Sequence, residues 1–137
     1  SRLNAKIVEL SSNENNIECF LKLECGSDVI AYSAMKFIQI NSLDVGSSVL
    51  VLVESDSVSI SKLDKEEISS RNRLKVKITD IVINDKDVLL TLMLSKNQNL
   101  TSRITLRSFQ NLHLEIGDEV MAMFKAYNVT LLKDGDL

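Results

Sequence analysis

The chain has 137 residues, enough for one ordinary domain or two very small ones, with a net charge of −3 and only 4% aromatic residues. Acidic charge and few rings argue against a nucleic-acid surface, which needs a basic face and aromatic stacking partners. The sequence has no apolar run near the roughly 18 residues of a membrane span, and no signal-peptide pattern, so we expect no membrane contact.

Two cysteines bear on the compartment. Cys19 and Cys25 fall in one expected strand, too far apart along it for a disulfide, and on the same face as apolar neighbours. We therefore expect buried free thiols and a reducing, cytoplasmic setting. Because the whole chain has a single histidine, metal ligation is the weaker alternative. The first residue is Ser rather than Met, from which we expect a fragment or a processed chain.

The two halves of the sequence resemble each other. Shifted by 71 positions, the chain aligns with itself without a gap, through turns as well as strands. Identical residues meet along the whole alignment, including Arg2 with Arg73, Leu21 with Leu92, Gln39 with Gln110, Gly46 with Gly117, and Lys62 with Lys133. A constant offset predicts two copies of one module. We expect the first module at residues 1–63, a polar linker at 64–68 and the second module at 69–137.

In the first copy, apolar and polar residues mostly alternate with the two-residue period of a β-strand. Five strands are predicted, over Ala5–Leu10, Ile17–Leu23, Val29–Ala34, Val49–Val53 and Val58–Ser61. The repeat places a short helix between the third and fourth of them.

The second copy shows the same order more clearly. Its strands are predicted at Leu74–Ile83, Val88–Leu94, Leu100–Thr105, Val120–Lys125 and Val129–Leu132. After the third strand the apolar period becomes helical over Leu106–Leu112, and Thr105 is placed to cap this helix. Five short strands with one helix after the third are the layout of an OB-like barrel. The predicted fold class is all-β: two tandem OB-like five-stranded barrels, each with one short helix.

Modules of about 65 residues bury only a small core and gain stability by packing on one another or on a second chain. We therefore expect self-association, first as a homodimer and otherwise as a higher oligomer. A binding site between chains becomes possible in such an assembly.

Three short segments of the second copy combine positive charge with small hydroxyls and lack any carboxylate: Ser69–Asn72, Thr105–Ser108 and Lys125–Ala126. Guanidinium and ammonium groups supply charge to an anion, while hydroxyls and helix-start amides donate directional hydrogen bonds. Together they suit a small tetrahedral dianion. Taken singly, each has a plainer interpretation: a linker charge for Arg71, a helix cap for Thr105, and a solvated strand end for Lys125.

These segments, with Gly117–Val120 and the run Lys125–Val129, resemble the Mop domain, also called the molbindin or TOBE-type oxyanion-binding OB fold. The resemblance covers all of the second copy but only the scaffold of the first. Tandem modules of this kind are similar to the molybdenum-sensing half of molybdate-responsive transcription regulators and to the di-Mop molbindins.

The resemblance implies a non-covalent site for molybdate or tungstate at a subunit or domain interface, with no metal ligated directly by side chains. Ser69, Thr105 and Ser108 would donate hydroxyls, and Arg71 and Lys125 would supply the charge. The backbone amide of Ala126 would be a further donor. By position, the oxyanion-binding residues are thus Ser69, Arg71, Thr105, Ser108, Lys125 and Ala126.

The sequence departs from the family pattern in both copies. In the second copy, Ser70 stands where the family usually has Ala, and Val76 where it usually has Gly. In the first copy, Ala34, Phe37 and Glu54 replace the residues matching Thr105, Ser108 and Lys125. Because a carboxylate repels a dianion, we expect the first copy to have lost its half of the site. The positions matching Ser69 and Arg71 would lie before residue 1, and they could still complete a composite site.

The favoured function is that of the effector-sensing domain of a molybdate-responsive transcription regulator, which would meet DNA only through a missing upstream domain. A free-standing molbindin that stores the anion and the regulatory tail of a molybdate transporter ATPase remain open alternatives. So does an OB-fold module that binds nucleic acid or protein, which belongs to a different class. No nucleophile–base pair, glycine-rich phosphate loop or metal cluster is recognisable in the sequence, so we expect no enzyme activity.

Overall fold

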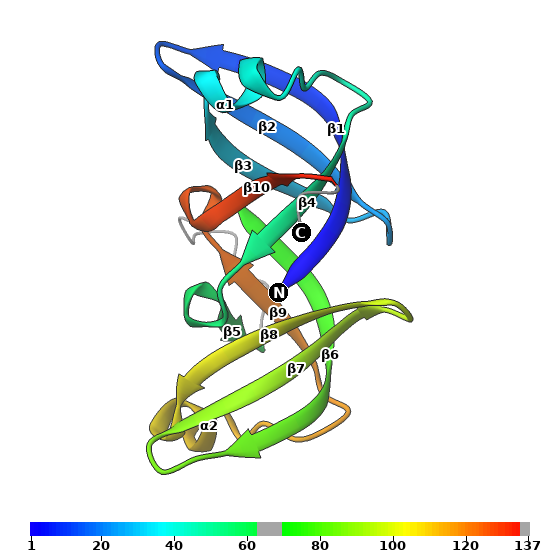
Figure 1. Cartoon of the computed structure of the whole chain (residues 1–137). Coiled ribbons are helices and arrows are strands. Elements are labelled where there is room, and N and C mark those ends of the chain that lie inside the picture. The colour runs from blue at the N-terminus through cyan, green and yellow to red at the C-terminus, as the bar shows by residue number, and fades with distance from the viewer. Residues whose placement is uncertain (63–69, 135–137) are drawn as a thin grey trace.

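The computed structural model describes residues 1–62 and 70–134 (Figure 1). It contains two curled five-stranded antiparallel sheets, drawn one above the other in Figure 1. Each has one short α-helix beside it. The predicted all-β fold class with two tandem OB-like units is confirmed.

The elements of the first repeat follow the predicted order. They are β1 (Arg2–Asn13), β2 (Asn16–Leu23), β3 (Asp28–Ala34), α1 (Met35–Ile40), β4 (Ser48–Val53), the 3₁₀ turn η1 (Ser55–Ser57) and β5 (Ser59–Ser61). The second repeat gives the same series. It comprises β6 (Asn72–Ile83), β7 (Asp87–Ser95), β8 (Gln98–Thr105), α2 (Leu106–Leu112), β9 (Glu119–Phe124), the 3₁₀ turn η2 (Ala126–Asn128) and β10 (Val129–Lys133).

The fifth strands are exchanged between the two sheets. The first sheet has the order β10-β4-β1-β2-β3, and the second has the order β5-β9-β6-β7-β8. The last strand of the chain thus pairs with β4, with Leu131 opposite Val51, while β5 pairs with β9, with Ile60 opposite Ala122. The expectation that each repeat closes on its own fifth strand is therefore wrong. The ranges 1–63 and 69–137 remain predictions about sequence units, because neither sheet is built from one range alone.

The physical reason for the exchange lies in the turns before the fifth strands. Val53 ends β4 and η1 follows it, after which β5 pairs with β9; in the same way η2 follows Phe124, after which β10 pairs with β4. In Figure 1 the strands β4, β9 and β10 consequently gather between the two lobes. The exchange makes each sheet depend on the other repeat.

Both sheets curl because their long first strands bend at equivalent places. The pairing of β1 with β2 shifts register between Ile7 and Glu9, and the pairing of β6 with β7 shifts between Ile78 and Asp80. Such irregularities increase local twist and let one strand serve two parts of a barrel. The end strands β10 and β3 of the first sheet come close to each other as a result.

A tight turn before β4 and before β9 also repeats. Gly46 has φ +93° and Gly117 has φ +96°, values that a side chain with a Cβ rarely adopts. The amide of Gly46 donates to the carbonyl of Ile7, and that of Gly117 to the carbonyl of Ile78, both at 2.8 Å. These turns therefore tie the start of the fourth strand to the bend of the first strand in each repeat.

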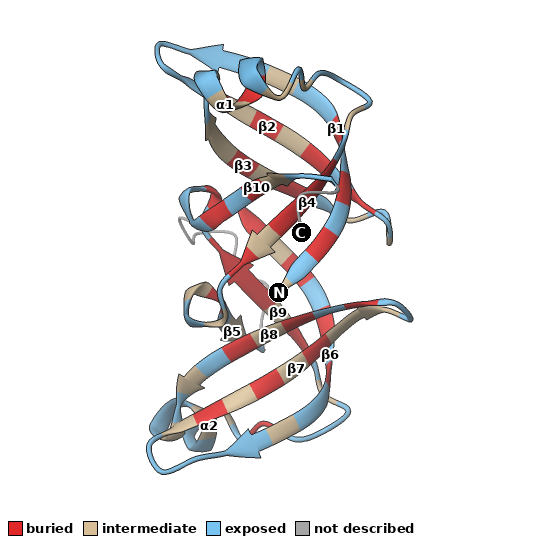
Figure 2. Cartoon of the chain, in the orientation of Figure 1, coloured by how far each residue is buried: buried red, intermediate tan, exposed pale blue. Residues whose placement is uncertain are grey.

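The buried side chains form one continuous core that runs through both repeats, as the red bands of Figure 2 indicate. Its largest fully buried member is Phe124 at the end of β9. Strand residues alternate between this core and solvent, as in Leu3, Ala5 and Ile7 of β1. Burial at about 25 cal/mol per Å² of apolar surface is the main stabilising term. One shared core means that the repeats stabilise each other.

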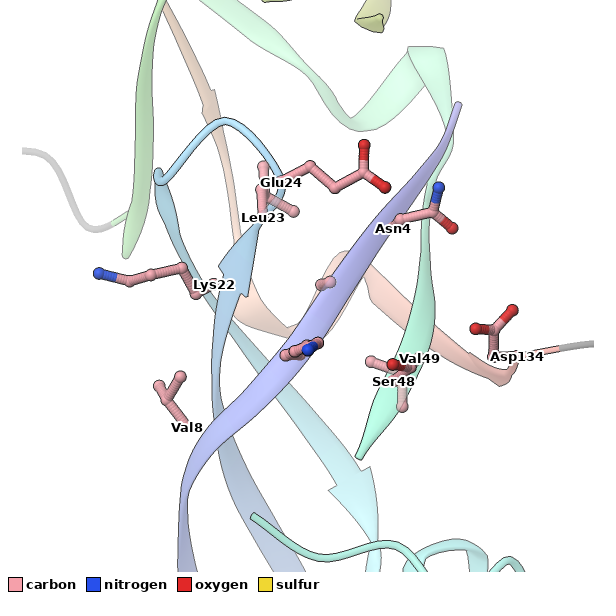
Figure 3. Close-up of a pocket in the computed structure, with 10 residues that line it drawn as sticks. Asn4, Val8, Lys22, Leu23, Glu24, Ser48, Val49 and Asp134 are labelled. Atoms are coloured by element: carbon pink, nitrogen blue, oxygen red, sulfur yellow. The ribbon is translucent and has the colours of Figure 1, made fainter. Parts of the chain in front are cut away.

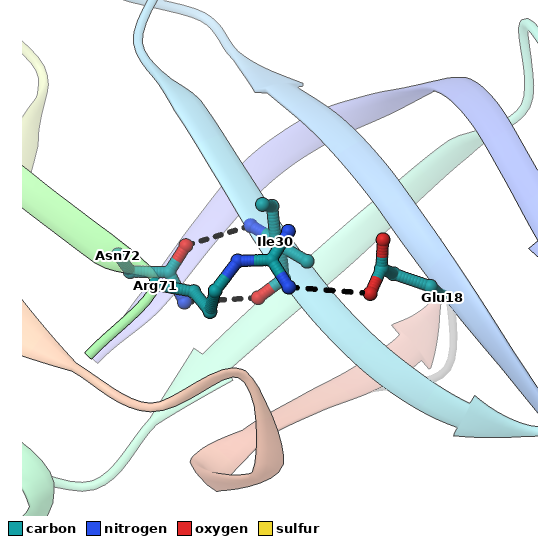
Figure 4. Close-up of polar contacts among 4 residues, drawn as sticks. All are labelled: Glu18, Ile30, Arg71 and Asn72. Atoms are coloured by element: carbon teal, nitrogen blue, oxygen red, sulfur yellow. Dashed lines mark hydrogen bonds and ion pairs between the residues drawn. The ribbon is translucent and has the colours of Figure 1, made fainter. Parts of the chain in front are cut away.

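Two polar contacts between the repeats are related by the same 71-residue offset. The side chain of Asn72 accepts a hydrogen bond from the Ile30 amide at 2.7 Å and donates to the Ile30 carbonyl at 2.9 Å (Figure 4). At the equivalent place, the hydroxyl of Ser1 accepts from the Thr101 amide at 2.9 Å. Each first strand is thus fastened at its start to the third strand of the other repeat.

Replacing Asn72 by Leu should lower the free energy of unfolding by about 2–4 kcal/mol, because the partly buried amide and carbonyl of Ile30 would both lose their partner. Urea denaturation followed by circular dichroism measures this loss. Asn99→Leu, on the exposed side of β8, is the matched control and should change stability by less than about 0.5 kcal/mol. Equal effects of the two substitutions would show that the Asn72 contacts do not stabilise the fold.

Both cysteines are free, but only one is fully buried. Cys19 on β2 has no exposed surface, whereas Cys25 in the β2–β3 turn is partly exposed, so the prediction of two buried thiols is wrong for Cys25. Burial, with a smaller contribution from the neighbouring Glu18 charge, raises the pKa of Cys19 from 9.0 to about 11. The thiolate of Cys19 is therefore strongly disfavoured in the folded protein.

This pKa predicts a loss of stability at high pH. The folded state keeps Cys19 protonated, so the stabilisation is complete below about pH 9 and is lost as the pH rises toward 11. Two pKa units correspond to about 2–3 kcal/mol. In Cys19→Ala this part of the decline should disappear, as measured by urea denaturation at pH 8, 9 and 10. A decline that is identical in the variant would assign it to tyrosine and lysine titration instead.

Candidate functional site

Three of the predicted site residues lie around one pocket. Arg71, Lys125 and Ala126 line a cavity of about 330 Å³ together with Tyr32 and Tyr127. The pocket lies where β3 of the first repeat faces η2 and the start of β6 of the second. It therefore lies at a junction between the two repeats.

The turn η2 presents Lys125 and its neighbours. Lys125 is the extended residue that precedes this turn, and the Asn128 amide donates to its carbonyl at 2.9 Å. Ala126 is buried and Tyr127 is 77% exposed. The first residue of the turn thus packs into the core, and the side chain of the second residue lies at the surface. Because Lys125 is exposed beside a buried residue, its ammonium group can reach the pocket without being desolvated.

Arg71 enters the pocket from the start of β6. The neighbouring Asn72, held on both backbone groups of Ile30, fixes the backbone from which the Arg71 side chain leaves. In Figure 4 the guanidinium runs across β3 toward Glu18. Its Nη1 atom lies 3.4 Å from Oε2 of Glu18, an ion pair whose side chains are 48% and 22% exposed. The charge of Arg71 is thus partly neutralised by a carboxylate.

Two tyrosines complete the lining. The rings of Tyr32 on β3 and Tyr127 on η2 have centroids 4.5 Å apart and are tilted by 33°, a favourable aromatic arrangement. Tyr32 lies opposite Glu18 in the β2–β3 register. A hydrogen bond to the Glu18 carboxylate is the main cause that raises the pKa of Tyr32. The Glu18 carboxylate therefore interacts with both Arg71 and Tyr32.

Sequence reasoning missed Glu18 and Tyr32, because they lie in the repeat that it assigned to scaffold. Their approach to Arg71 depends on how the first repeat packs on the second, which no local pattern encodes. Tyr127 stood within the quoted run Lys125–Val129 but received no role. The repeat offset gives no signal for it, since Asp56, a residue of a different type, stands at its equivalent in the first copy.

Thr105 and Ser108 lie elsewhere in the same chain. Thr105 caps α2: its hydroxyl oxygen accepts from the Ser108 amide at 3.1 Å, and its hydroxyl donates to that of Ser108 at 3.0 Å. Both residues are exposed, and neither lines the pocket of Arg71. Figure 1 shows α2 at the far end of the second sheet. The predicted capping of this helix is confirmed, and one chain alone does not bring all the predicted site residues together.

Ser69, the remaining predicted site residue, lies outside the described residues. The next one, Ser70, is partly exposed and directly precedes Arg71.

The equivalent place in the first repeat carries the opposite charge. Glu54 and Asp56, around η1, stand where the second repeat has Lys125 and Tyr127. Asp56 pairs with Arg103 at 3.6 Å, and Arg103 is the repeat equivalent of Tyr32. The aromatic pair of one junction is thus replaced by an ion pair at the other. Two carboxylates make this second junction unfavourable for an anion, in line with the sequence interpretation.

A larger cavity of about 600 Å³ lies on β1, β2 and β4 (Figure 3). Its charged lining residues are Lys6, Lys22, Glu24 and Asp134, and Lys22 is already paired with Asp28 at 3.2 Å. Balanced charge of this kind offers no net attraction to an anion or a cation.

Within residues 1–62 and 70–134, no three His, Cys, Asp or Glu side chains come together in a way that could hold a metal ion. None of the described helices has the length and apolar character needed to cross a bilayer.

The chain resembles a protein family by sequence and a solved structure by fold. Residues 68–131 match the TOBE domain family. The fold matches that of the cytoplasmic molybdate-binding protein ModG, in a crystal form with molybdate bound, with a TM-score of 0.92. That likeness covers 97% of this chain and 95% of ModG at 23% sequence identity, and it shows the fold alone.

Curated relatives are found among transporter components. The molybdenum import ATP-binding protein ModC of Photobacterium profundum is 29% identical over 103 residues, which are 74% of this chain and 29% of that protein. ModC of Brucella abortus is 35% identical over 77 residues, which are 56% of this chain and 21% of that protein. The chain therefore spans less than a third of the length of the curated relatives it matches.

Proposed function

From the premise that residues 68–131 form a TOBE domain within a tandem OB-like fold, we propose that this chain binds molybdate or tungstate as an intact oxyanion. The observation that carries the proposal is the convergence of Arg71, Lys125 and Ala126 on one pocket. Arg71 stands far in sequence from the adjacent Lys125 and Ala126, and residue chemistry together with the family resemblance predicts all three as anion-binding residues. ModG, whose fold this chain shares, is a molybdate-binding protein, and ModC acts in molybdenum import.

The pocket suits a dianion held without covalent bonds. A guanidinium donates two parallel hydrogen bonds to adjacent oxygens, and an ammonium supplies a compact second charge. The Ala126 amide stands at the first position of η2 and would serve as a directional donor. The side chains of Tyr32 and Tyr127 also line the cavity. No redox chemistry or proton transfer is needed for such binding.

We propose further that two chains share each site. Thr105 and Ser108 are exposed at the start of α2 and do not face Arg71 within the chain, so a second copy would have to bring them to it. A homodimer is the simplest assembly that does so, since a two-fold interface repeats every contact. The oxyanion would then stabilise one packing of the dimer through linkage.

The cellular role has three candidates, each supported by a different likeness. The match over nearly the full length of ModG favours a free-standing cytoplasmic binding protein. The ModC relatives favour the regulatory part of a transporter ATPase. The effector half of a transcription regulator rests on the resemblance of the tandem modules alone. An ATP-binding loop on the same polypeptide would favour the transporter role, and a DNA-binding helix-turn-helix on it would favour the regulator role.

Calorimetric titration of the chain with molybdate, tungstate, sulfate and phosphate tests the proposal. We expect molybdate and tungstate to bind with dissociation constants of about 1 µM or below, and sulfate and phosphate much more weakly. Sedimentation velocity with and without molybdate tests whether ligand and self-association are linked. Absence of molybdate binding by a folded chain would refute the proposed function.

A further inference from the structure

A carboxylate that the proposed function does not need is paired with Arg71, one of the residues that line the pocket. Glu18 comes from β2 of the first repeat, and its Oε2 atom lies 3.4 Å from Nη1 of Arg71 (Figure 4). Its side chain is 22% exposed and that of Arg71 is 48% exposed, so the ion pair is partly open to solvent. A dianion approaching Arg71 must therefore meet a fixed negative charge.

We propose that Glu18 is a tethered competitor of the oxyanion: it occupies the Arg71 guanidinium in the empty pocket and lowers the affinity for the dianion. This inference rests on the proposed function and concerns the regulation of the same site. A carboxylate and an oxyanion present the same kind of acceptor oxygens to a guanidinium, so they compete for the same donors. Binding of the dianion breaks the Arg71–Glu18 pair.

The surroundings of Glu18 keep the competitor in place. The β2–β3 register sets Tyr32 opposite Glu18, and Tyr32 in turn packs against Tyr127 of η2. Arg71 is fixed from the other side, because Asn72 is bonded to both backbone groups of Ile30 on β3. Both partners of the ion pair are thus anchored to β2 and β3, so the contact is re-formed whenever the anion leaves.

Competition of this kind gives the site two properties. The empty pocket keeps Arg71 oriented and paired, which limits its capture by other anions. Electrostatic repulsion between Glu18 and the bound dianion speeds the release of the dianion. Glu18 is the one acidic side chain within hydrogen-bonding distance of Arg71 among the contacts of the described residues.

Glu18→Gln tests the proposal, because glutamine keeps the length of the side chain and an acceptor oxygen for Tyr32 while removing the charge. We expect the variant to bind molybdate roughly 3- to 30-fold more tightly than the parent, the range given by one fixed charge acting on a dianion a few ångströms away in a solvent-exposed site. Glu119→Gln is the matched control: Glu119 pairs with Lys75 at 4.0 Å on the second sheet, away from the pocket. It should leave the affinity unchanged.

A second ligand separates electrostatic competition from a structural effect. Perrhenate is a tetrahedral monoanion of similar shape to molybdate, so its repulsion by Glu18 is about half as large. The gain in Glu18→Gln should therefore be smaller for perrhenate than for molybdate. The unfolding temperature should change little, since the pair is partly exposed.

The outcomes distinguish the two proposals. If the parent binds molybdate and Glu18→Gln binds it equally or more weakly, Glu18 is not a competitor and only this inference fails. An equal gain for perrhenate and molybdate also overturns it, because charge would not be the cause. If neither protein binds molybdate while both are folded, the proposed function fails and this inference fails with it.

Discussion

Replacing Arg71 by Ala should weaken molybdate binding about 100-fold or more, the largest loss expected from a single substitution in the pocket. A charge-assisted contact that loses its donor typically costs about 2–4 kcal/mol, and each 1.4 kcal/mol is tenfold in affinity. Two effects of this substitution lower the affinity for molybdate. The dianion loses its guanidinium, and Glu18, no longer paired at 3.4 Å, remains beside the pocket as a negative charge without its cationic partner.

Lys125 provides the comparison. Lys125→Ala removes one charge without freeing a carboxylate, so its loss should be smaller, about 10-fold to 100-fold. Lys125→Glu places at η2 the residue found at the equivalent position of η1, where Glu54 stands, and should abolish binding. Calorimetric titration measures all three variants.

Arg2→Ala, an exposed arginine on β1, is the control for a general loss of positive charge. It should keep the affinity of the parent within about twofold. Unchanged affinity in both Arg71→Ala and Lys125→Ala would show that the oxyanion binds elsewhere, and would remove the site assignment while leaving the fold intact.

Separating the repeats should abolish independent folding. A piece with residues 1–62 lacks β10, the neighbour of β4, and a piece with residues 70–137 lacks β5, the neighbour of β9. The first piece would expose the face on which Leu131 packs, and the second would lose the cover of Val58, both members of the shared core. We expect neither piece alone to be a folded monomer, and the two mixed in equal amounts to form a folded complex.

Circular dichroism and thermal unfolding of each piece and of the mixture measure this outcome, and light scattering gives their masses. The control is the intact chain with a protease site inserted between residues 63 and 69: after cleavage it should remain folded as a complex of the two pieces. A folded monomer of either piece would show that its own fifth strand can turn back and close its own sheet, contrary to the observed pairing.

The strands and helices of this protein were predictable because their signals are local. The alternation of Leu74, Val76 and Ile78 marks β6, and the hydroxyl of Thr105 caps α2 as its position before the helix predicted. The positive φ of Gly46 and Gly117 matches turns that the repeat had already paired. In each case a residue and its near neighbours determine the conformation.

The site was predictable only in part. Arg71, Lys125 and Ala126 were chosen from residue chemistry and from the resemblance, and they line one pocket. Glu18 and Tyr32 were not chosen, because nothing near them in sequence indicates an approach to Arg71. Thr105 and Ser108 were chosen, yet they lie away from this pocket within the chain. Their role as ligands stays a prediction until the assembly is known.

By itself, the sequence determined a tandem repeat of two all-β modules and the location of positive charge and hydroxyls in the second one. Only the tertiary structure decided that β5 and β10 change places, and that a glutamate of the first repeat meets an arginine of the second. The physical reason is the sequence separation over which the interactions act. Strand period, capping and turn geometry act over a few residues, whereas strand exchange and the Glu18–Arg71 contact depend on how one shared core is packed from both repeats.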